Sequence, residues 1–191
     1  MSHSTVIRGK RSILLIALIT AIVLSWPPGV AAEQTGRLQD EADIRKLTIC
    51  YAHGTDAIGR GDVAAGRAIY QPCFTKDATF SAAFPNGQQE KRTGSDAWAD
   101  FVATVFQGAG YTSTQHLLGT ISIEVQDKSA TMSTYLHATH VLPNGSIDIA
   151  NGTYEDTVVK TEEGWRIQSR KLTLITFLNV APTAPHPRSE E

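Results

Sequence analysis

The sequence predicts an α+β fold, in which three helices of the N-terminal half enclose a pocket against a strongly curved, mostly antiparallel sheet that forms a cone. Helical spacing of apolar residues dominates up to about residue 106, whereas long strand-like segments separated by short turns follow from Thr112 onward. Helices followed by a long antiparallel meander are typical of α+β domains with the helices on one sheet face. Strands of about a dozen residues need strong twist and bulges, which curl the sheet and leave a pocket.

The first helix is predicted from about Asp40 to Ile58. Its apolar stripe repeats at helical spacing and consists of Ile44, Leu47, Cys50, Tyr51 and Ile58. The run Gly59-Arg60-Gly61 should end this helix, and Asp62 is suited to cap a second helix from Val63 to about Tyr70. Ser95 should cap a third helix, whose core-facing residues are Trp98, Phe101, Val102, Val105 and Phe106.

A short hairpin is predicted between the second and third helices. It has a strand at Ala78 to Phe84, a turn at Pro85-Asn86-Gly87 and a partner strand near Gln89 to Arg92. Four longer strands follow, separated by segments with hairpin-turn chemistry. Their predicted ranges are Thr112 to Gln126, Ser129 to Leu142, Ser146 to Thr161 and Trp165 to Phe177.

The N-terminal residues 1–32 have the three-part design of a secretory signal peptide. Three basic residues precede an apolar run at positions 13–24, and Val30-Ala31-Ala32 supplies small residues for cleavage before Glu33. We therefore expect an exported protein, periplasmic or secreted, while an uncleaved N-terminal anchor remains open. The rest of the chain divides into a polar lead-in at 33–39, a single domain at 40–178 and a flexible tail at 179–191.

The composition is mildly acidic. The formal charge is −2, and loss of the leader with Arg8, Lys10 and Arg11 would change it to about −5. A body of this charge without a basic stripe argues against nucleic acid as a partner. Cys50 and Cys73 can form a disulfide in an oxidising compartment, but two buried free thiols are equally compatible with the sequence.

Asp56 and His116 are the first candidates for chemistry. A carboxylate that holds an imidazole fixes its tautomer and raises its basicity, which gives a general base that works near neutral pH. His116 lies within a predicted strand, and Asp56 lies near the end of the first helix. Helical periodicity alone does not aim Asp56 at the pocket, because it is about 500° of rotation from Tyr51. A bend at Gly54 or a loosened last turn would be needed.

Strand alternation selects further candidates. His140 shares a strand face with Met132, Leu136 and other mostly apolar residues and should face the pocket, whereas His137 should point to the other side. This opposition argues against a metal clamp formed by the two histidines. The turn at Asn144-Gly145 leaves two registers open, one with Asn151 and one with Tyr154 on the side of His140.

Order and spacing of motifs resemble the SnoaL-like branch of the nuclear-transport-factor-2-like superfamily, which includes scytalone dehydratase and hexachlorocyclohexane dehydrochlorinase. The matching pieces are Ile44-x-x-Leu47 leading to Asp56, the segment from Cys73 to Phe80, Thr114-Gln115-His116 with Gly119-Thr120, Gly152-Thr153-Tyr154 and Gly164-Trp165-Arg166-Ile167. The resemblance covers about Asp40 to Phe177. It implies a catalytic dyad of Asp56 and His116, with His140 as a second histidine of the site, and it favours Tyr154 over Asn151 as the pocket residue.

Several positions depart from these relatives. Phe80 and Thr55 stand where scytalone dehydratase has tyrosines, and Phe80 cannot donate a proton to a substrate. Gly152 and Tyr154 stand where that enzyme has a serine and an asparagine. The lysine and arginine of the dehydrochlorinase correspond to Tyr51 and Lys160. The resemblance therefore implies a type of chemistry but not a substrate.

The sequence thus favours an exported lyase, of the dehydratase or dehydrohalogenase type, or an isomerase that needs no cofactor and no metal. Its substrate would be small, hydrophobic and cyclic. His116 would remove a proton, Asp56 would hold the imidazole, and His140 or Tyr154 would stabilise or protonate the departing group. The expected pocket residues are Tyr154, Phe80, Trp98, Tyr51, Phe101 and Leu118.

Two alternatives remain open: a non-catalytic module that binds small ligands, and an enzyme similar to the polyketide cyclases. A homodimer or homotrimer is expected from the resemblance. We expect neither a nucleic acid partner nor stable membrane insertion if the leader is cleaved.

Overall fold

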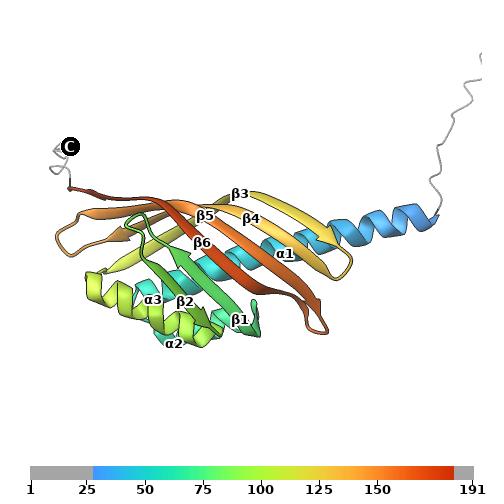
Figure 1. Cartoon of the computed structure of the whole chain (residues 1–191), viewed down its shortest axis with the longest axis horizontal. Helices are drawn as coiled ribbons and strands as arrows, with labels where there is room; N and C mark the ends of the chain where they lie inside the picture. Colours follow the sequence, from blue (N-terminus) through green and yellow to red (C-terminus); the bar gives the residue numbers. More distant parts are fainter. Residues whose placement is uncertain (1–27, 183–191) are drawn as a thin grey trace, which may run out of the picture.

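The computed structural model describes residues 28–182 and confirms the α+β architecture. Three helices are present in this part of the chain, α1 (Pro28–Gly59), α2 (Val63–Tyr70) and α3 (Ser95–Ala109). The strands are β1 (Phe74–Ala83), β2 (Gln89–Thr93), β3 (Ser113–Gln126), β4 (Ser129–Val141), β5 (Ile147–Thr161) and β6 (Gly164–Val180). Figure 1 shows the curved sheet with α1 running along its concave side.

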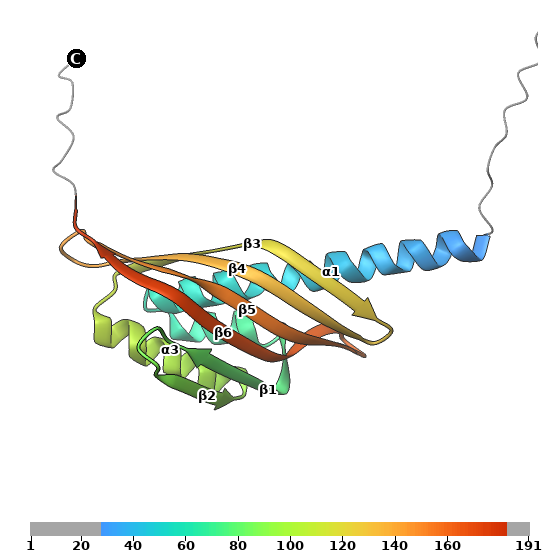
Figure 2. The same ribbon diagram turned by 45° about the horizontal axis from the view of Figure 1, so that its top comes forward.

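The six strands form one sheet in the order β2-β1-β6-β5-β4-β3. Neighbouring strands are antiparallel except β1 and β6, which run parallel. The register shifts in β3 after Gly119, where Thr120 adopts a φ of 47°, and twice between β5 and β6. These irregularities bend the long strands. Figure 2 shows the resulting curl, with α3 and the β1–β2 hairpin gathered at one end of the sheet.

Helix α1 begins at Pro28 instead of near Asp40. Proline suits the first turn of a helix, and the predicted lead-in is rich in helix-forming residues. Residues 32–39 are exposed, and side-chain burial in the core starts at Ile44. This first part of α1 projects beyond the sheet (Figures 1 and 2). The predicted leader lies outside the described residues except for the first turns of this helix.

The boundaries of α2 agree with the sequence prediction. Gly61, with a φ of 87°, ends the connection after α1, and the Asp62 side chain accepts a hydrogen bond from the Ala65 backbone at 3.0 Å. Helix α3 differs in detail. Its N-cap is Gly94, no side chain caps it, and Ser95 is its first helical residue, so the prediction that Ser95 caps this helix is wrong.

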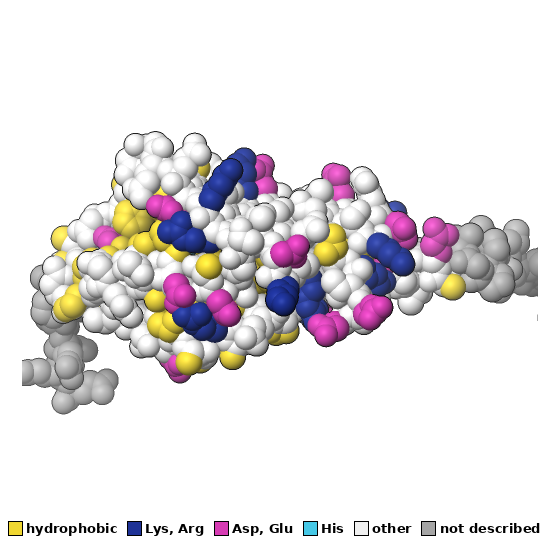
Figure 3. All heavy atoms as spheres, turned by 60° about the horizontal axis from the view of Figure 1, so that its bottom comes forward, with side chains coloured by type: hydrophobic (Ala, Val, Ile, Leu, Met, Phe, Trp, Pro, Cys, Tyr) yellow, Lys and Arg dark blue, Asp and Glu magenta, His cyan; other side chains and the backbone are white. Residues whose placement is uncertain are grey.

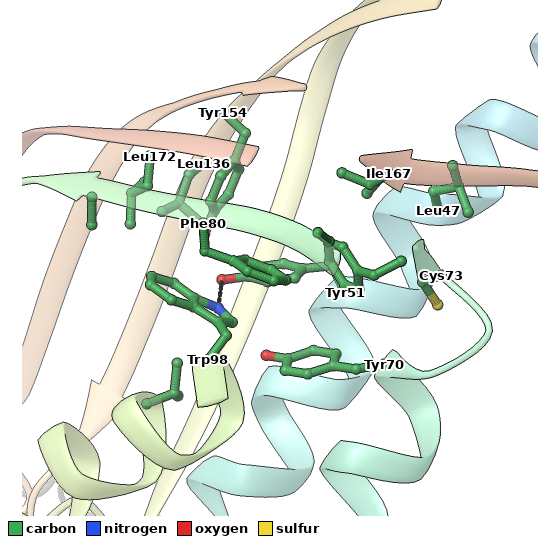
Figure 4. Close-up of a cluster of buried hydrophobic side chains, with 14 of the residues drawn as sticks. Leu47, Tyr51, Tyr70, Cys73, Phe80, Trp98, Leu136, Tyr154, Ile167 and Leu172 are labelled. Carbon is green, nitrogen blue, oxygen red and sulfur yellow. Dashed lines mark hydrogen bonds between the residues drawn. The ribbon is translucent and has the colours of Figure 1, made fainter. Parts of the chain in front are cut away.

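A cluster of aromatic rings fills the space between the helices and the sheet (Figure 4). Tyr51 stacks on Tyr70 with ring centroids 5.5 Å apart, and Phe80 stacks on Trp98 at 5.1 Å. The indole Nε1 of Trp98 donates a hydrogen bond to the Tyr51 hydroxyl at 3.2 Å. This polar contact links α1 to α3 and gives the buried indole N–H the partner that it needs.

A disulfide joins Cys50 of α1 to Cys73, which follows α2, with 6.4 Å between their Cα atoms. It settles the choice between a bridge and two free thiols in favour of the bridge. Because the crosslink closes a loop of 23 residues, it stabilises the packing of α1 on α2 mainly by restricting the unfolded chain.

The surface carries both signs of charge. On the face in Figure 3, Lys and Arg side chains alternate with Asp and Glu side chains, and no continuous basic stripe is visible. Within residues 28–182, no helix combines the length and the apolar character that a membrane span requires.

Candidate functional site

Asp56 at the end of α1 and His116 on β3 form a hydrogen-bonded pair. The Nδ1 atom of His116 lies 2.7 Å from Oδ1 of Asp56, and the backbone N–H of His116 donates to Oδ2 at 3.2 Å. The Thr114 hydroxyl donates to Oδ1 at 3.0 Å. A carboxylate can only accept here, so Nδ1 carries a ring hydrogen, and in the neutral imidazole Nε2 has the lone pair. This is the tautomer that a general base requires.

The electrostatics of Asp56 agree with a permanent negative charge. Burial alone would raise the pKa of this carboxyl, but the hydrogen bonds from His116 and Thr114 and the attraction to His116 outweigh burial and hold the pKa below its ordinary value. The side chains of His116 and Asp56 are 6% and 16% exposed. A charged acceptor in such a sheltered place orients the imidazole strongly.

Asp56 lies in the last turn of α1, where the backbone N–H of Arg60 is shared between the carbonyls of Asp56 and Ala57, and its side chain reaches β3 from there. The last two turns of α1 are buried on two sides. Tyr51 and Ile58 belong to the hydrophobic core, whereas Gly59 lies against Thr114 of β3. A side chain at Gly59 would collide with Thr114, which shows how closely the helix end approaches this strand. Asp56 lies on that second side.

His140 on β4 lies next to the pair. Its ring centroid is 5.5 Å from that of His116, and the residue is 3% exposed. Burial, with repulsion from His116 as the second cause, lowers the pKa of His140 to about 4. Nδ1 faces the backbone carbonyl of Asp148 at 3.3 Å, and a carbonyl only accepts. His140 is therefore a neutral acceptor at neutral pH, which does not favour the proton-donor role predicted for it.

A hydrogen-bonded group formed by Tyr111, Asp148 and Asn179 adjoins His140. The Tyr111 hydroxyl donates to Oδ2 of Asp148 at 2.7 Å, and the Asn179 amide donates to Oδ1 at 2.6 Å. The ring of Tyr111 lies 4.8 Å from that of His140. Burial and the adjacent carboxylate raise the pKa of Tyr111 well above its ordinary value, so this phenol stays protonated. Sequence reasoning missed both Tyr111 and Asp148.

Both histidines line a cavity of about 100 Å³ between the sheet, α1 and α3. Four of the six predicted pocket residues line it: Tyr51, Trp98, Phe101 and Tyr154. Further lining residues are mostly apolar and include Phe84, Val102, Val105, Phe106, Leu136, Leu172, Leu174 and Phe177. A volume of this order holds a single small ring, since engineered apolar cavities of about 150 Å³ bind benzene.

Phe80 and Leu118 do not line the cavity, contrary to the prediction. Phe80 lies behind Trp98, whose ring stacks on it and separates it from the space. Leu118 follows His116 by two residues on β3 and packs against the hydrophobic core. Knowing which strand face is buried was therefore not enough to predict the lining of the cavity, because the large indole ring of Trp98 lies between Phe80 and the cavity.

The register of β4 and β5 places Tyr154 opposite Thr134 on the inner face and Asn151 opposite His137 on the outer face. Tyr154 is 1% exposed. His137 contacts Asn151, with 2.8 Å between Nδ1 and Oδ1, and lies away from His140 as alternation predicted. Lys160 also lies away from the cavity, where it pairs with Asp40.

A buried ion pair supports the two tyrosines of the cavity. Arg170 on β6 binds Asp156 on β5 through two hydrogen bonds of 2.8 and 2.6 Å, and the two side chains are 1% and 0% exposed. The guanidinium lies over the rings of Tyr51 and Tyr154, at 4.1 and 4.6 Å from their centroids. These contacts fix both rings and place a positive group next to them.

Among the described residues, no cluster of three His, Cys, Asp or Glu side chains is arranged to hold a metal ion. The site consists of an imidazole, oriented by a carboxylate, at the wall of an apolar cavity.

A family profile described as SnoaL-like domain matches residues 36–171. The chain belongs to the SnoaL-like family. The resemblance seen in its motifs is thereby confirmed, and the cone-shaped sheet with three helices is the fold of its nuclear-transport-factor-2-like relatives. No curated protein matches the chain significantly by sequence.

Solved structures of low identity share the fold. A candidate scytalone dehydratase from Novosphingobium aromaticivorans is 22% identical with a TM-score of 0.61, and the match covers 83% of this chain and 99% of that one. A type 3 hexachlorocyclohexane dehydrochlorinase from Novosphingobium barchaimii is 15% identical with a TM-score of 0.64, over 81% and 99% of the two chains. A candidate aromatic ring hydroxylase from Novosphingobium aromaticivorans is 25% identical with a TM-score of 0.60, over 75% and 94%.

Proposed function

We propose that this SnoaL-like protein is a cofactor-independent lyase or isomerase that acts on a small hydrophobic cyclic molecule. The observation that carries the proposal is the Asp56–His116 pair at the wall of an apolar cavity. A single oriented base in a water-poor space is sufficient for proton abstraction from carbon when the resulting charge is delocalised or lost with a leaving group. The names of two related structures, a candidate dehydratase and a dehydrochlorinase, agree with this chemistry.

The reaction begins at Nε2 of His116, which takes a proton from a substrate carbon. In elimination, the electrons of that C–H bond form a new double bond while a hydroxide or halide leaves with its own bonding pair. In isomerisation, the same imidazolium returns the proton to another carbon. In both cases Asp56 stabilises the positive charge that develops on His116, because its carboxylate accepts the Nδ1 hydrogen throughout.

The phenols of Tyr51 and Tyr154, which also line the cavity, are suited to stabilise negative charge. Tyr51 accepts from Trp98, and both Tyr51 and Tyr154 lie under the guanidinium of Arg170. A phenol hydroxyl that donates to a substrate oxygen stabilises that oxygen as it becomes negative. Tyr154 therefore takes the stabilising role that sequence analysis shared between Tyr154 and His140.

The test is a comparison of wild-type protein with His116→Gln and Asp56→Asn on a panel of hydroxylated and halogenated single-ring substrates. We expect turnover of at least one compound by wild type. His116→Gln should lower kcat by about 10²- to 10⁴-fold, because a positioned base contributes that much. His137→Gln is the matched control, since this exposed histidine lies on the outer face of the sheet.

Equal turnover by wild type and His116→Gln would contradict the proposal. Ligand binding that persists in both variants, with no turnover by any of the proteins, would instead identify a non-catalytic binding module.

Export and self-association belong to the same proposal. The signal-peptide pattern at residues 1–32 supports export, and N-terminal sequencing of protein from a secreting host should find Glu33 as the first residue. For self-association, the support is an exposed apolar group on the outer sheet face, formed by Leu117, Tyr135 and Ile175. Light scattering should give the mass of a homodimer or homotrimer for wild type and a smaller mass for Tyr135→Asp.

A further inference from the structure

The residues that contact His140 indicate how the cavity selects its ligand. This inference rests on the proposed function of the same cavity. Asp148 on β5 binds three partners from three different segments. Its carboxylate accepts from Tyr111, which precedes β3, and from Asn179 at the end of β6, while its backbone carbonyl faces Nδ1 of His140 on β4.

The contact with the Asp148 carbonyl determines which nitrogen of His140 carries the hydrogen. Because the carbonyl of Asp148 accepts the Nδ1 hydrogen, Nε2 has no hydrogen and lies on the opposite edge of the ring. The ring is packed between Tyr111 at 4.8 Å and Phe106 at 5.3 Å, so it has little freedom to turn. In its neutral form His116 also presents a lone pair to the cavity, and the two rings lie 5.5 Å apart.

The hydroxyl groups of Tyr111 and Thr55 are not available to donate a hydrogen bond to Nε2 of His140. Tyr111 gives its hydrogen to Asp148, and Thr55 gives its hydrogen to the Tyr51 carbonyl at 2.9 Å. The imidazole end of the cavity therefore has two acceptors and no free donor among these groups. A polar atom left without a partner in an apolar cavity costs binding energy, whereas a ligand that donates a hydrogen bond removes this cost.

We propose that Asp148 is a positioning residue of this cavity: with Tyr111, it holds His140 as a hydrogen-bond acceptor and makes the site selective for neutral ring compounds that carry a hydroxyl group. The hydroxyl binds Nε2 of His140, and the carbon that loses its proton lies against His116. Ethers and halides of the same ring lack the donor and bind more weakly.

Equilibrium binding of phenol and of anisole to the purified protein tests the proposal without any need for turnover, so a failure of the proposed reaction and a failure of this inference can be told apart. Ligand-detected NMR titration should give about tenfold tighter binding of phenol than of anisole, the size expected for one hydrogen bond. His140→Phe should bring the ratio to about one. Tyr111→Phe should lower the ratio about threefold. This substitution removes the hydrogen bond to Asp148 that keeps the Tyr111 ring in place against His140.

Tyr135→Phe is the matched control for Tyr111→Phe, since it removes an exposed phenol from the outer sheet face. Its ratio should equal that of wild type. Nitrogen-15 spectra of the histidine rings give an independent measurement, in which His140 should carry its hydrogen on Nδ1 at neutral pH. The Asp148→Asn variant, which retains the backbone carbonyl, should keep this tautomer but show the reduced phenol preference of Tyr111→Phe.

Equal binding of the two probes to wild type, or no binding of phenol, would overturn the proposal. A hydrogen on Nε2 of His140 would also overturn it. Unchanged phenol preference in both Tyr111→Phe and Asp148→Asn would remove Asp148 as the positioning residue.

Discussion

The two faces of the sheet carry the same kinds of side chain in neighbouring positions, yet they differ in environment. On β4, His140 faces the cavity and His137 faces outward. On β5 and β6, Asp156 pairs with Arg170 on the inner face, and the adjacent Glu155 pairs with Lys171 on the outer face.

Burial determines how strongly each charged group depends on its partner. The inner ion pair is 1% and 0% exposed and packs against two tyrosine rings, whereas the outer pair is 58% and 59% exposed. Water screens the outer charges, but it cannot replace a missing partner on the inner face. A hydrogen-bonded histidine is likewise present on both faces, but it is His116 and His140 on the inner face that line the apolar cavity between the sheet and the helices.

The largest difference is expected for the two ion pairs. Asp156→Asn should lower the free energy of unfolding by about 3 to 5 kcal/mol, because it leaves the Arg170 charge buried without a counter-charge. Glu155→Gln should cost less than about 1 kcal/mol, since its partner is exposed. Urea denaturation of both variants measures the two values. Similar losses for both would show that burial is not what separates the faces.

A smaller effect is expected from the pH dependence of stability. The pKa of His140 is about 4 in the folded protein and near 6.5 in an unfolded chain, so the unfolded state binds more protons between these values. Stability should therefore fall by about 3 kcal/mol as the pH drops from 6.5 to 4. The lowered pKa of Asp56 adds a further loss only at more acidic pH, below its ordinary value.

His140→Phe should flatten the curve between pH 6.5 and 4 when unfolding is followed by circular dichroism. His137→Phe is the matched substitution on the outer face. An identical slope in wild type and His140→Phe would mean that the pKa of His140 does not differ between the folded and unfolded protein, which would contradict this prediction.

The smallest effect concerns single hydroxyl groups. Thr114→Val removes one hydrogen bond to the Asp56 carboxylate while keeping the side-chain shape, and it should lower kcat about tenfold, as expected for a bond to a charged group. Thr176→Val removes the contact with Asn151 on the outer face and should leave kcat unchanged. Steady-state kinetics on one turned-over substrate compares them. A loss in Thr176→Val as large as in Thr114→Val would contradict the division between the faces.

Much of the fold was predictable from local patterns. Alternation in β4 identified the buried face with Met132, Leu136 and His140, and the turn residues fixed the ends of α2 and of the long strands. The length of α1 was not predictable from its apolar stripe, because its first turns lie outside the core and carry no such stripe.

The site was only partly predictable. Asp56, His116 and His140 followed from their positions in the motif pattern, but the direction of Asp56 depends on β3 covering a second side of α1. Tyr111 and Asp148 form their bond across 37 residues, and no local sequence pattern indicates that they pair. Arg170 was missed because the strand pattern gives no sign of its pairing with Asp156.

The most direct test of the central claim is hydrogen exchange at the substrate carbon. When a compound that the wild-type protein turns over is incubated with it in deuterium oxide, mass spectrometry of the recovered substrate and product should show deuterium at the position next to the reacting bond. His116→Gln should show almost none, while His137→Gln should match wild type. Equal deuterium incorporation by wild type and His116→Gln would contradict the claim that His116, held by Asp56, removes the proton.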